Sequence, residues 1–228
     1  MCYQLREELS CCDVDGHLIF LDIAQDRYFK LTDHLEKAMR RFRAHEDVAS
    51  TLLEDLAAAR ILVEAPDLKA HATIANIQQP TRSAIEQPAA IAGHRLSVAI
   101  VFEVMTIVWS TRRQLKARAL KTNLDEASAY RDRKTGVFEV ATPTTLEDDM
   151  LQANRQFARA RRYVPIEPIC LLDSLSLLRF LSRRGLTANI VFGVTSEPFT
   201  AHCWVQAGDI VLNETLSDAN AHTPIRMI

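Results

Sequence analysis

A cysteine and a histidine occupy positions where they could act as a nucleophile and its base. Cys170 follows Pro168 and opens a leucine-rich stretch that predicts a helix, and His202 lies later in a run typical of a strand. The first turn of a helix has unpaired backbone N–H groups and the positive end of the helix dipole, which favour the thiolate form of a cysteine. A neighbouring histidine can take and return the proton, so the pair predicts nucleophilic thiol chemistry.

A third residue that orients the histidine is expected on the following strand. If Ala207–Asp209 form a three-residue hairpin loop, Glu214 lies opposite His202. A two-residue loop places Asn213 or Thr215 there instead, because a one-residue shift in register moves each side chain to the other face. A carboxylate or an amide oxygen could each accept the imidazole N–H and fix its tautomer. We favour Glu214 and keep Asn213 as the alternative.

The other cysteines carry no comparable signal. Cys203 is expected to point to the face of the strand opposite His202 and to be a core residue. The five cysteines are odd in number and include no CxxC pair, so they predict neither a disulfide scaffold nor a metal site, and they fit a reducing cytoplasm. No glycine-rich phosphate loop is present, and no cofactor is expected in this chain.

The elements that must position the pair are predicted as helices followed by an antiparallel meander. A basic turn and Gly185 end the helix that begins at Cys170. The preceding helices are expected near residues 96–121, 123–131 and 146–161, and the strands at Ala188–Val194, Thr200–Gln206 and Ile210–Asn213.

The first part of the chain predicts three strands followed by helices, a winged-helix-like arrangement. Asp15-Gly16 is a strong hairpin signal between the first two strands. Thr32 or Asp33 could cap a first helix that ends near Ala44, and Asp47 could open a second. The strands are expected at Glu8–Val14, His17–Asp22 and Arg27–Lys30, with a last short strand at residues 61–63.

The expected fold class is α+β, and composition divides the chain into two domains. Residues 66–94 carry three prolines and weak periodicity, so they predict a linker between a domain of residues 1–65 and a domain of residues 95–228. The apolar segment Leu96–Trp109 is too short to span a membrane and predicts a buried helix. The net charge of −2 gives no bulk attraction to nucleic acid or membrane. The basic stretch Arg112–Lys121 is interpreted as a solvated helix face, and no secretory signal is recognised.

Around the pair, the sequence resembles a known family. The stretches Cys170-Leu-Leu-Asp-Ser-Leu-Ser-Leu-Leu, Arg183-Arg-Gly-Leu, Phe192-Gly-Val, Pro198-Phe and Ala201-His-Cys-Trp-Val are similar to the lasso-peptide B proteins. These are papain- and transglutaminase-like leader peptidases. In the N-terminal part, Asp15-Gly16, Leu21-Asp22 and Arg27-Tyr-Phe-Lys-Leu resemble the RiPP recognition element, a PqqD-like winged-helix domain, so the two parts are expected to be fused here.

The resemblance implies a cytoplasmic enzyme that binds a lasso precursor and cleaves its leader from the core peptide. A partner cyclase similar to asparagine synthetase would then close the macrolactam with ATP. The family's Cys–His–Asp triad carries over to Cys170 and His202, with Glu214 where the family usually has aspartate. Asp173 stands where the family often has a basic residue, and no role is carried over to it.

The recognition domain is expected to bind the leader as an added strand beside residues 27–31, on the second helix. The candidate leader-binding residues are Arg27, Tyr28, Phe29, Leu31, Leu53 and Ala57. Tyr28 and Phe29 are expected to point to opposite faces. Two other readings stay open: an acyltransferase with a Cys–His–acid site, and a winged-helix DNA-binding regulator. The balanced charge of residues 34–60 argues against the regulator.

Overall fold

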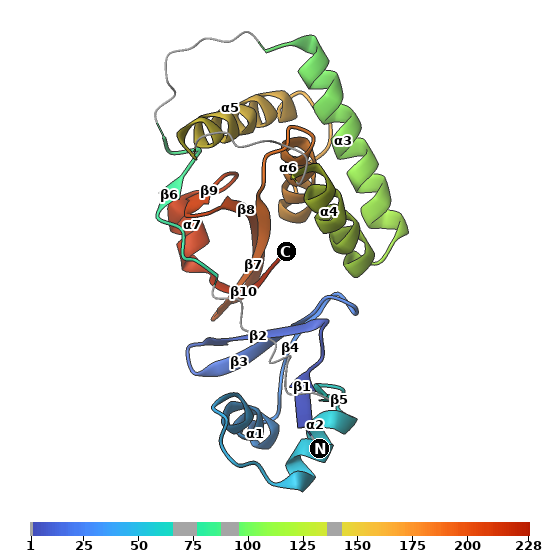
Figure 1. The fold of residues 1–228 in the computed structure, drawn as a ribbon, viewed down its shortest axis with the longest axis vertical. Coiled ribbons are helices and arrows are strands. Elements are labelled where there is room, and N and C mark those ends of the chain that lie inside the picture. Colours follow the sequence, from blue (N-terminus) through green and yellow to red (C-terminus); the bar gives the residue numbers. More distant parts are fainter. Residues whose placement is uncertain (1, 66–76, 88–95, 136–142) are drawn as a thin grey trace.

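The computed structural model describes residues 2–65, 77–87, 96–135 and 143–228. In Figure 1 these residues form a smaller N-terminal unit below and a larger C-terminal unit above. Both units combine helices with sheet, which confirms a mixed α and β architecture. In the described ranges, no helix is both long enough and apolar enough to cross a membrane.

The N-terminal unit is built on a three-stranded antiparallel meander. Strands β2 (Leu9–Val14) and β3 (His17–Asp22) are joined by a turn in which Asp15 and Gly16 both have positive φ angles, of 50° and 83°. Positive φ at both central residues is what a tight hairpin turn requires, so the predicted hairpin is confirmed. Strand β4 (Arg27–Lys30) pairs with β3 and is the last strand of this sheet in the order β2-β3-β4.

Two helices and a separate strand pair complete this unit. Helix α1 (Asp33–Arg43) begins after Thr32, as predicted. Helix α2 (Ser50–Ala58) begins after Ala49, so the prediction that Asp47 opens it was wrong. Strand β1 (Cys2–Leu5), which was not predicted, pairs antiparallel with β5 (Leu62–Ala65).

The two faces of the meander pack against different units. Leu18 and Phe20 lie in an apolar cluster with residues of α1 and α2. Ile19 and Leu21, which alternate with them along β3, lie in the main cluster of the C-terminal unit. Because both faces are covered, β3 is buried along nearly its whole length. The sheet is therefore the layer that joins the N-terminal helices to the C-terminal unit.

The C-terminal unit follows the predicted order of helices and then a meander. Its helices are α3 (Val98–Ala117), α4 (Leu120–Thr135), α5 (Pro143–Arg161) and α6 (Cys170–Ser182). The meander consists of β7 (Asn189–Ser196), β8 (Phe199–Ala207) and β9 (Ile210–Val211), followed by α7 (Leu216–Ala221) and β10 (Thr223–Met227). Helix α6 packs against α3, α4, α5 and β8 and is almost entirely buried. In Figure 1, α6 and α7 lie on opposite faces of the sheet.

The sheet of this unit contains two strands that the sequence analysis did not anticipate. Its order is β10-β7-β8-β9-β6, and β10 pairs antiparallel with β7. Strand β6 (Arg82–Ser83) falls within the predicted linker but pairs parallel with β9. Arg82 forms ion pairs with Asp209, at 3.0 Å, and with Glu147, at 2.6 Å. The described residues 77–87 thus belong to this sheet, whereas residues 66–76 and 88–94 of the predicted linker lie outside the described ranges.

Helix α3 differs from the buried helix predicted for its apolar segment. Val104, Ile107 and Val108 are buried, but Phe102 and Trp109 are 61% and 53% exposed. The helix packs mainly on α5 and α6, so part of its apolar surface stays exposed.

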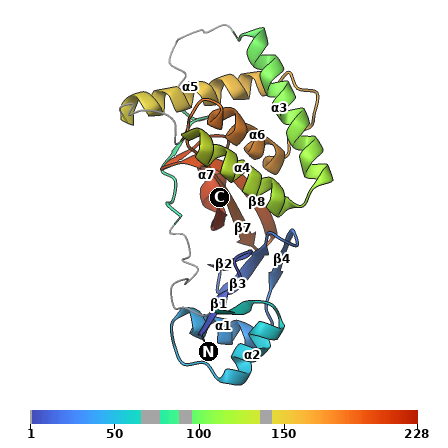
Figure 2. The ribbon, with the colours of Figure 1, turned by 45° about the vertical axis from the view of Figure 1, so that its right-hand side comes forward.

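Polar contacts also join the two units. Strand β10 packs beside β2, and Arg226 Nη1 donates to the Glu7 carbonyl oxygen at 3.2 Å. The Ser196 hydroxyl donates to the Asp15 carboxylate at the tip of the β2–β3 hairpin. The loop between β3 and β4 lies against helices of the C-terminal unit (Figure 2).

Candidate active site

Cys170 is the first residue of the central helix α6. Ile169 before it is extended, with φ −135° and ψ 129°, and no side chain caps the helix start. The first-turn N–H groups therefore receive no bond from an N-cap side chain, and the helix dipole points its positive end at the thiol. Cys170 itself is partly exposed, so this thiol is accessible while the rest of the helix is packed.

His202 and Glu214 form a hydrogen-bonded pair. His202 lies on β8 opposite Gly193 of β7, and its Nε2 is 2.8 Å from Glu214 Oε2. The second carboxylate oxygen accepts the backbone N–H of Thr215 at 2.9 Å. The hydroxyl of Ser83, on β6, donates to the Glu214 carbonyl oxygen at 2.6 Å. The side chain and the backbone of Glu214 are thus both held in place.

The register that brings Glu214 to His202 differs from the predicted one. Ala207 pairs with Ile210, so the loop has two residues, Gly208 and Asp209, which is the case for which Asn213 or Thr215 was expected opposite His202. Continuation of this register would place Thr215 opposite His202. Strand β9 ends at Val211, however, and the chain bends over the next residues. This bend, and not the strand register, carries the Glu214 side chain to the imidazole.

Asn213, the alternative partner, is used elsewhere. Its Oδ1 accepts the backbone N–H of Val205 at 2.7 Å, and its Nδ2 donates to the Ser174 hydroxyl at 3.1 Å. Ser174 lies in α6, and its Oγ also approaches the Cys203 carbonyl oxygen, at 3.4 Å. Asn213 and Ser174 therefore connect the start of α6 to strand β8. This connection fixes the position of Cys170 relative to His202.

The electrostatics of the pair favour a thiolate and an imidazolium. A hydrogen bond from the Cys203 thiol and a second from His202 lower the pKa of Cys170 to about 4, although burial acts in the opposite direction. The pKa of His202 is raised, first by its hydrogen bond to Cys170 and also by Glu214, against the effect of burial. At neutral pH the Cys170 thiol is therefore ionised, and a protonated His202 beside it could donate a proton.

Cys203 contributes to the site in a way that the sequence analysis did not foresee. It is buried, as expected, but its thiol hydrogen-bonds to Cys170, and this contact and burial raise its own pKa well above the ordinary value. Cys203 thus stays protonated, and its thiol lies 4.0 Å from the Ser174 hydroxyl oxygen, to which it donates. Its position directly after His202 in the sequence is a signal that Cys203 lies near the site, but strand alternation predicts that its side chain points to the opposite face.

A buried ion pair lies one turn into α6. Arg161 Nε donates to Asp173 Oδ1 at 2.7 Å, and their side chains are 10% and 20% exposed. Burial raises the pKa of Asp173, while Arg161 opposes that shift. Arg161 is the last residue of α5, so the pair fixes the end of α5 to the first turn of α6. The sequence analysis assigned no role to either residue.

The candidate leader-binding residues lie on β4 and α2. Phe29 stacks on Phe20 within the N-terminal unit, with ring centroids 5.2 Å apart. Tyr28 faces the other way and meets Phe199 edge-on at 5.7 Å. Tyr28 and Phe29 therefore point to opposite faces, as predicted. Arg27 is exposed with its guanidinium 5.2 Å from the Phe29 ring, while Leu31, Leu53 and Ala57 are partly buried.

Tyr28 also lies within electrostatic reach of Cys170 and Cys203, which the sequence does not predict. Burial raises its pKa, and Cys203 and Cys170 add to the shift through their charge. One side chain of the N-terminal strand β4 thus reaches the neighbourhood of the nucleophile. No local pattern in the sequence signals this proximity, because it depends on how the two units pack.

Gly193, which pairs with His202 across the sheet, leaves room for the Trp204 ring and for His222. A Cβ at this position would lie 2.8 Å from the Trp204 ring and 2.9 Å from the His222 Cβ. His222 and Trp204 are the aromatic neighbours of His202, with ring centroids at 5.4 Å and 6.4 Å from the imidazole.

We therefore expect Gly193→Ala to destabilise the protein by about 1–3 kcal/mol and to displace these rings. Denaturant unfolding followed by tryptophan fluorescence measures the loss, with Gly16→Ala as a comparison whose Cβ has open space but a positive φ. A Gly193→Ala variant with unchanged midpoint and fluorescence would contradict the close packing.

Within the described part of the chain, no group of three or more His, Cys, Asp or Glu side chains is placed to hold a metal ion.

Comparison with known proteins gives a family for the larger unit. The chain is 42% identical over 45 residues to the microcin J25-processing protein McjB of Escherichia coli, a match that covers 20% of this chain and 22% of the relative. The match thus spans about a fifth of the length of that relative. No solved structure matches the chain significantly. The family model of the transglutaminase-like superfamily matches residues 98–227, more than half of the chain, and the protein therefore belongs to the transglutaminase-like superfamily.

Proposed function

We propose that this protein is a cysteine peptidase that removes the leader from a lasso-peptide precursor. The observation that carries the proposal is the arrangement of Cys170 at the start of α6 with its pKa near 4, beside a His202 that is held by Glu214. A lasso-peptide processing role is consistent with the partial match to a microcin-processing protein. The transglutaminase-like unit supplies the thiol chemistry.

The proposed reaction proceeds through a thioester. The Cys170 thiolate attacks the scissile carbonyl carbon, and the backbone N–H of Cys170 stabilises the resulting oxyanion. The His202 imidazolium gives its proton to the leaving amine, which departs as the new N-terminus of the core peptide. Neutral His202 then takes a proton from water as the hydroxide attacks the thioester, and the leader leaves as a carboxylic acid. Glu214 fixes the orientation of His202 throughout.

Leader binding is proposed at the open edge of β4. This strand has one neighbour, β3, in its sheet among the described residues, so its other edge can accept an additional strand. On an added strand, the side chains on the same face of the sheet as Phe29 would point toward α2, where Leu31, Leu53 and Ala57 lie. The side chains on the same face as Tyr28 would point toward the C-terminal unit. Arg27 would lie at the end of this edge. In this reading the N-terminal unit is a PqqD-like, winged-helix recognition domain.

The proposed partners are the precursor peptide and an asparagine-synthetase-like cyclase. The cyclase would use ATP to close the macrolactam on the freed core peptide, and this chain would need no cofactor of its own. Both steps would take place in the cytoplasm.

The decisive assay incubates the full chain with the short precursor peptide encoded beside its gene, with and without the cyclase and ATP. Mass spectrometry is expected to show a leader that has gained water and a core peptide with a free amine. If the leader carries an added amine in place of water, the site is an acyltransferase. If the precursor is unchanged under every condition, the peptidase proposal fails.

Hydrogen exchange tests the place of leader binding. With the leader peptide added to Cys170→Ala protein, we expect hydrogen exchange at the backbone amides of β4 to slow by about tenfold or more. The β1–β5 pair is the internal control, because it lies in the same unit but outside the proposed site. Protection that appears on β1–β5 and not on β4 would move the leader to another edge.

A further inference from the structure

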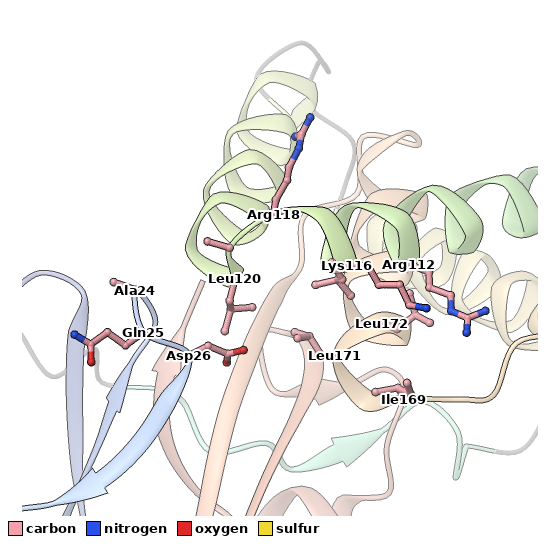
Figure 3. A pocket seen from close by; sticks show the side chains of 12 residues that line it. Ala24, Gln25, Asp26, Arg112, Lys116, Arg118, Leu120, Ile169, Leu171 and Leu172 are labelled. Carbon is pink, nitrogen blue, oxygen red and sulfur yellow. The ribbon is translucent and has the colours of Figure 1, made fainter.

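A groove of about 430 Å³ lies where the β3–β4 loop of the N-terminal unit meets α3, α4 and α6 (Figure 3). Its floor is apolar and its rim is charged. The apolar residues are Leu115, Leu120, Ile169, Leu171 and Leu172, and the loop contributes Ala24, Gln25 and Asp26. The groove is therefore built by both units, and neither unit forms it alone.

Two cations of the rim are placed to receive a ligand. Arg112 and Lys116 are both exposed and lie one helical turn apart on α3. In Figure 3 they lie on the side of Leu171 and Ile169. Arg118, the third cation of the lining, points away and is paired with Glu126 at 2.5 Å. The two α3 cations give the groove a basic side next to its apolar floor.

One end of the groove is lined by the two residues that flank Cys170 in the chain. Ile169 and Leu171 flank Cys170 in the chain, and Ile169 is 56% exposed. At the other end, Asp26 directly precedes β4. The charges of Asp26 and Cys170 both help to raise the pKa of Tyr28. The groove therefore has a residue that adjoins β4 at one end and residues that adjoin Cys170 at the other.

The direction of β4 decides which end of a bound peptide enters. Strand β4 runs from Arg27, beside the groove, to Lys30, away from it. A peptide added antiparallel to β4 runs the opposite way, so that its C-terminal continuation is delivered to the groove. A peptide added parallel would deliver its N-terminal side instead. Because the scissile bond lies on the C-terminal side of a leader, the antiparallel orientation fits the geometry.

We infer that this groove binds an acidic, partly apolar segment of the substrate peptide, located between the strand held on β4 and the scissile bond. The apolar floor would take one or two aliphatic side chains, and Arg112 and Lys116 would face carboxylates. The inference rests on the proposed function, since it assigns a subsite to the same substrate.

The first test measures the charge preference at Cys170 with two small thiol reagents. Sulfonatoethyl and trimethylammonioethyl methanethiosulfonate have the same reactive group and opposite charge, and each transfers its thioalkyl group to the thiolate and releases methanesulfinate. Their rate ratio does not depend on the fraction of thiolate. We expect the ratio of anionic to cationic reagent to fall about tenfold in Arg112→Glu/Lys116→Glu. Cys170→Ser protein gives the background from other cysteines.

A matched control carries the same change of charge away from the groove. Arg113 and Arg133 are exposed on α3 and α4 and do not line it. The Arg113→Glu/Arg133→Glu variant should leave the ratio within twofold of the original protein. An equal fall in both double variants would show a general effect of net charge and would overturn the assignment.

The second test asks whether a peptide occupies the groove. An acetylated hexapeptide that alternates leucine with aspartate or glutamate should slow alkylation of Cys170 by iodoacetamide. Its counterpart with lysine should not, and the Arg112→Glu/Lys116→Glu variant should reverse this order. If the acidic peptide leaves the rate unchanged, the groove is not a peptide subsite and the inference is wrong.

The two proposals fail separately. An intact precursor, together with protection by the acidic peptide, would remove the peptidase function but leave a peptide-binding groove. Cleavage of the precursor at equal rates by the original protein and by Arg112→Glu/Lys116→Glu would remove the subsite and leave the peptidase.

Discussion

Replacement of Cys170 by alanine is expected to abolish cleavage of the precursor and to leave leader binding intact. The thiol is the only group at the start of α6 that can form the thioester, so the loss should be at least about 10³-fold in the cleavage rate. Leader binding should stay within about twofold, because β4 lies in the other unit and keeps its open edge. Mass spectrometry of the products and calorimetry with the leader peptide measure the two effects.

Cys203→Ala is the matched control for this result. It removes the neighbouring thiol that helps to lower the pKa of Cys170, so this pKa should rise from about 4. His202 and the helix start still stabilise the thiolate, and activity at pH 7 should stay within about tenfold. Full activity of Cys170→Ala, combined with loss of activity in Cys203→Ala, would show that the nucleophile was assigned to the wrong cysteine.

The sequence predicted those parts of the fold whose signals are local. The Asp15-Gly16 turn and the helix from Cys170 needed no knowledge of distant residues. Strands β1, β6 and β10 were missed because each is short and is defined by a partner far away in the chain. Strand β6 was hidden further by prolines and polar residues that are typical of a linker.

The site shows the same division between local and distant causes. The sequence placed Cys170 on a helix start and His202 on a strand. The hydrogen bond between His202 and Glu214 was expected, but from a three-residue loop that the structure does not contain. A bend after β9 makes the contact. Tyr28 could not be placed near the nucleophile, since only the packing of two units brings it there.

The pH dependence of cleavage tests the role of Glu214. The thiolate–imidazolium pair exists between the pKa of Cys170, about 4, and the raised pKa of His202. Cleavage should therefore follow a bell whose acidic limb lies near pH 4 and whose basic limb lies above the ordinary histidine pKa of 6.5. In Glu214→Gln the charge that helps to raise the pKa of His202 is lost, so the basic limb should move to lower pH.

Glu214→Gln should also lower the maximal rate, by about 10- to 10³-fold, because the amide holds the imidazolium less strongly than the carboxylate does. Asn213→Ala is the informative comparison. Asn213 connects Val205 to Ser174, so its loss should reduce stability by about 1–3 kcal/mol and leave the basic limb where it is. If instead Asn213→Ala moves the basic limb and Glu214→Gln does not, then Asn213 orients the histidine, and the bend after β9 has brought Glu214 to His202 without a catalytic consequence.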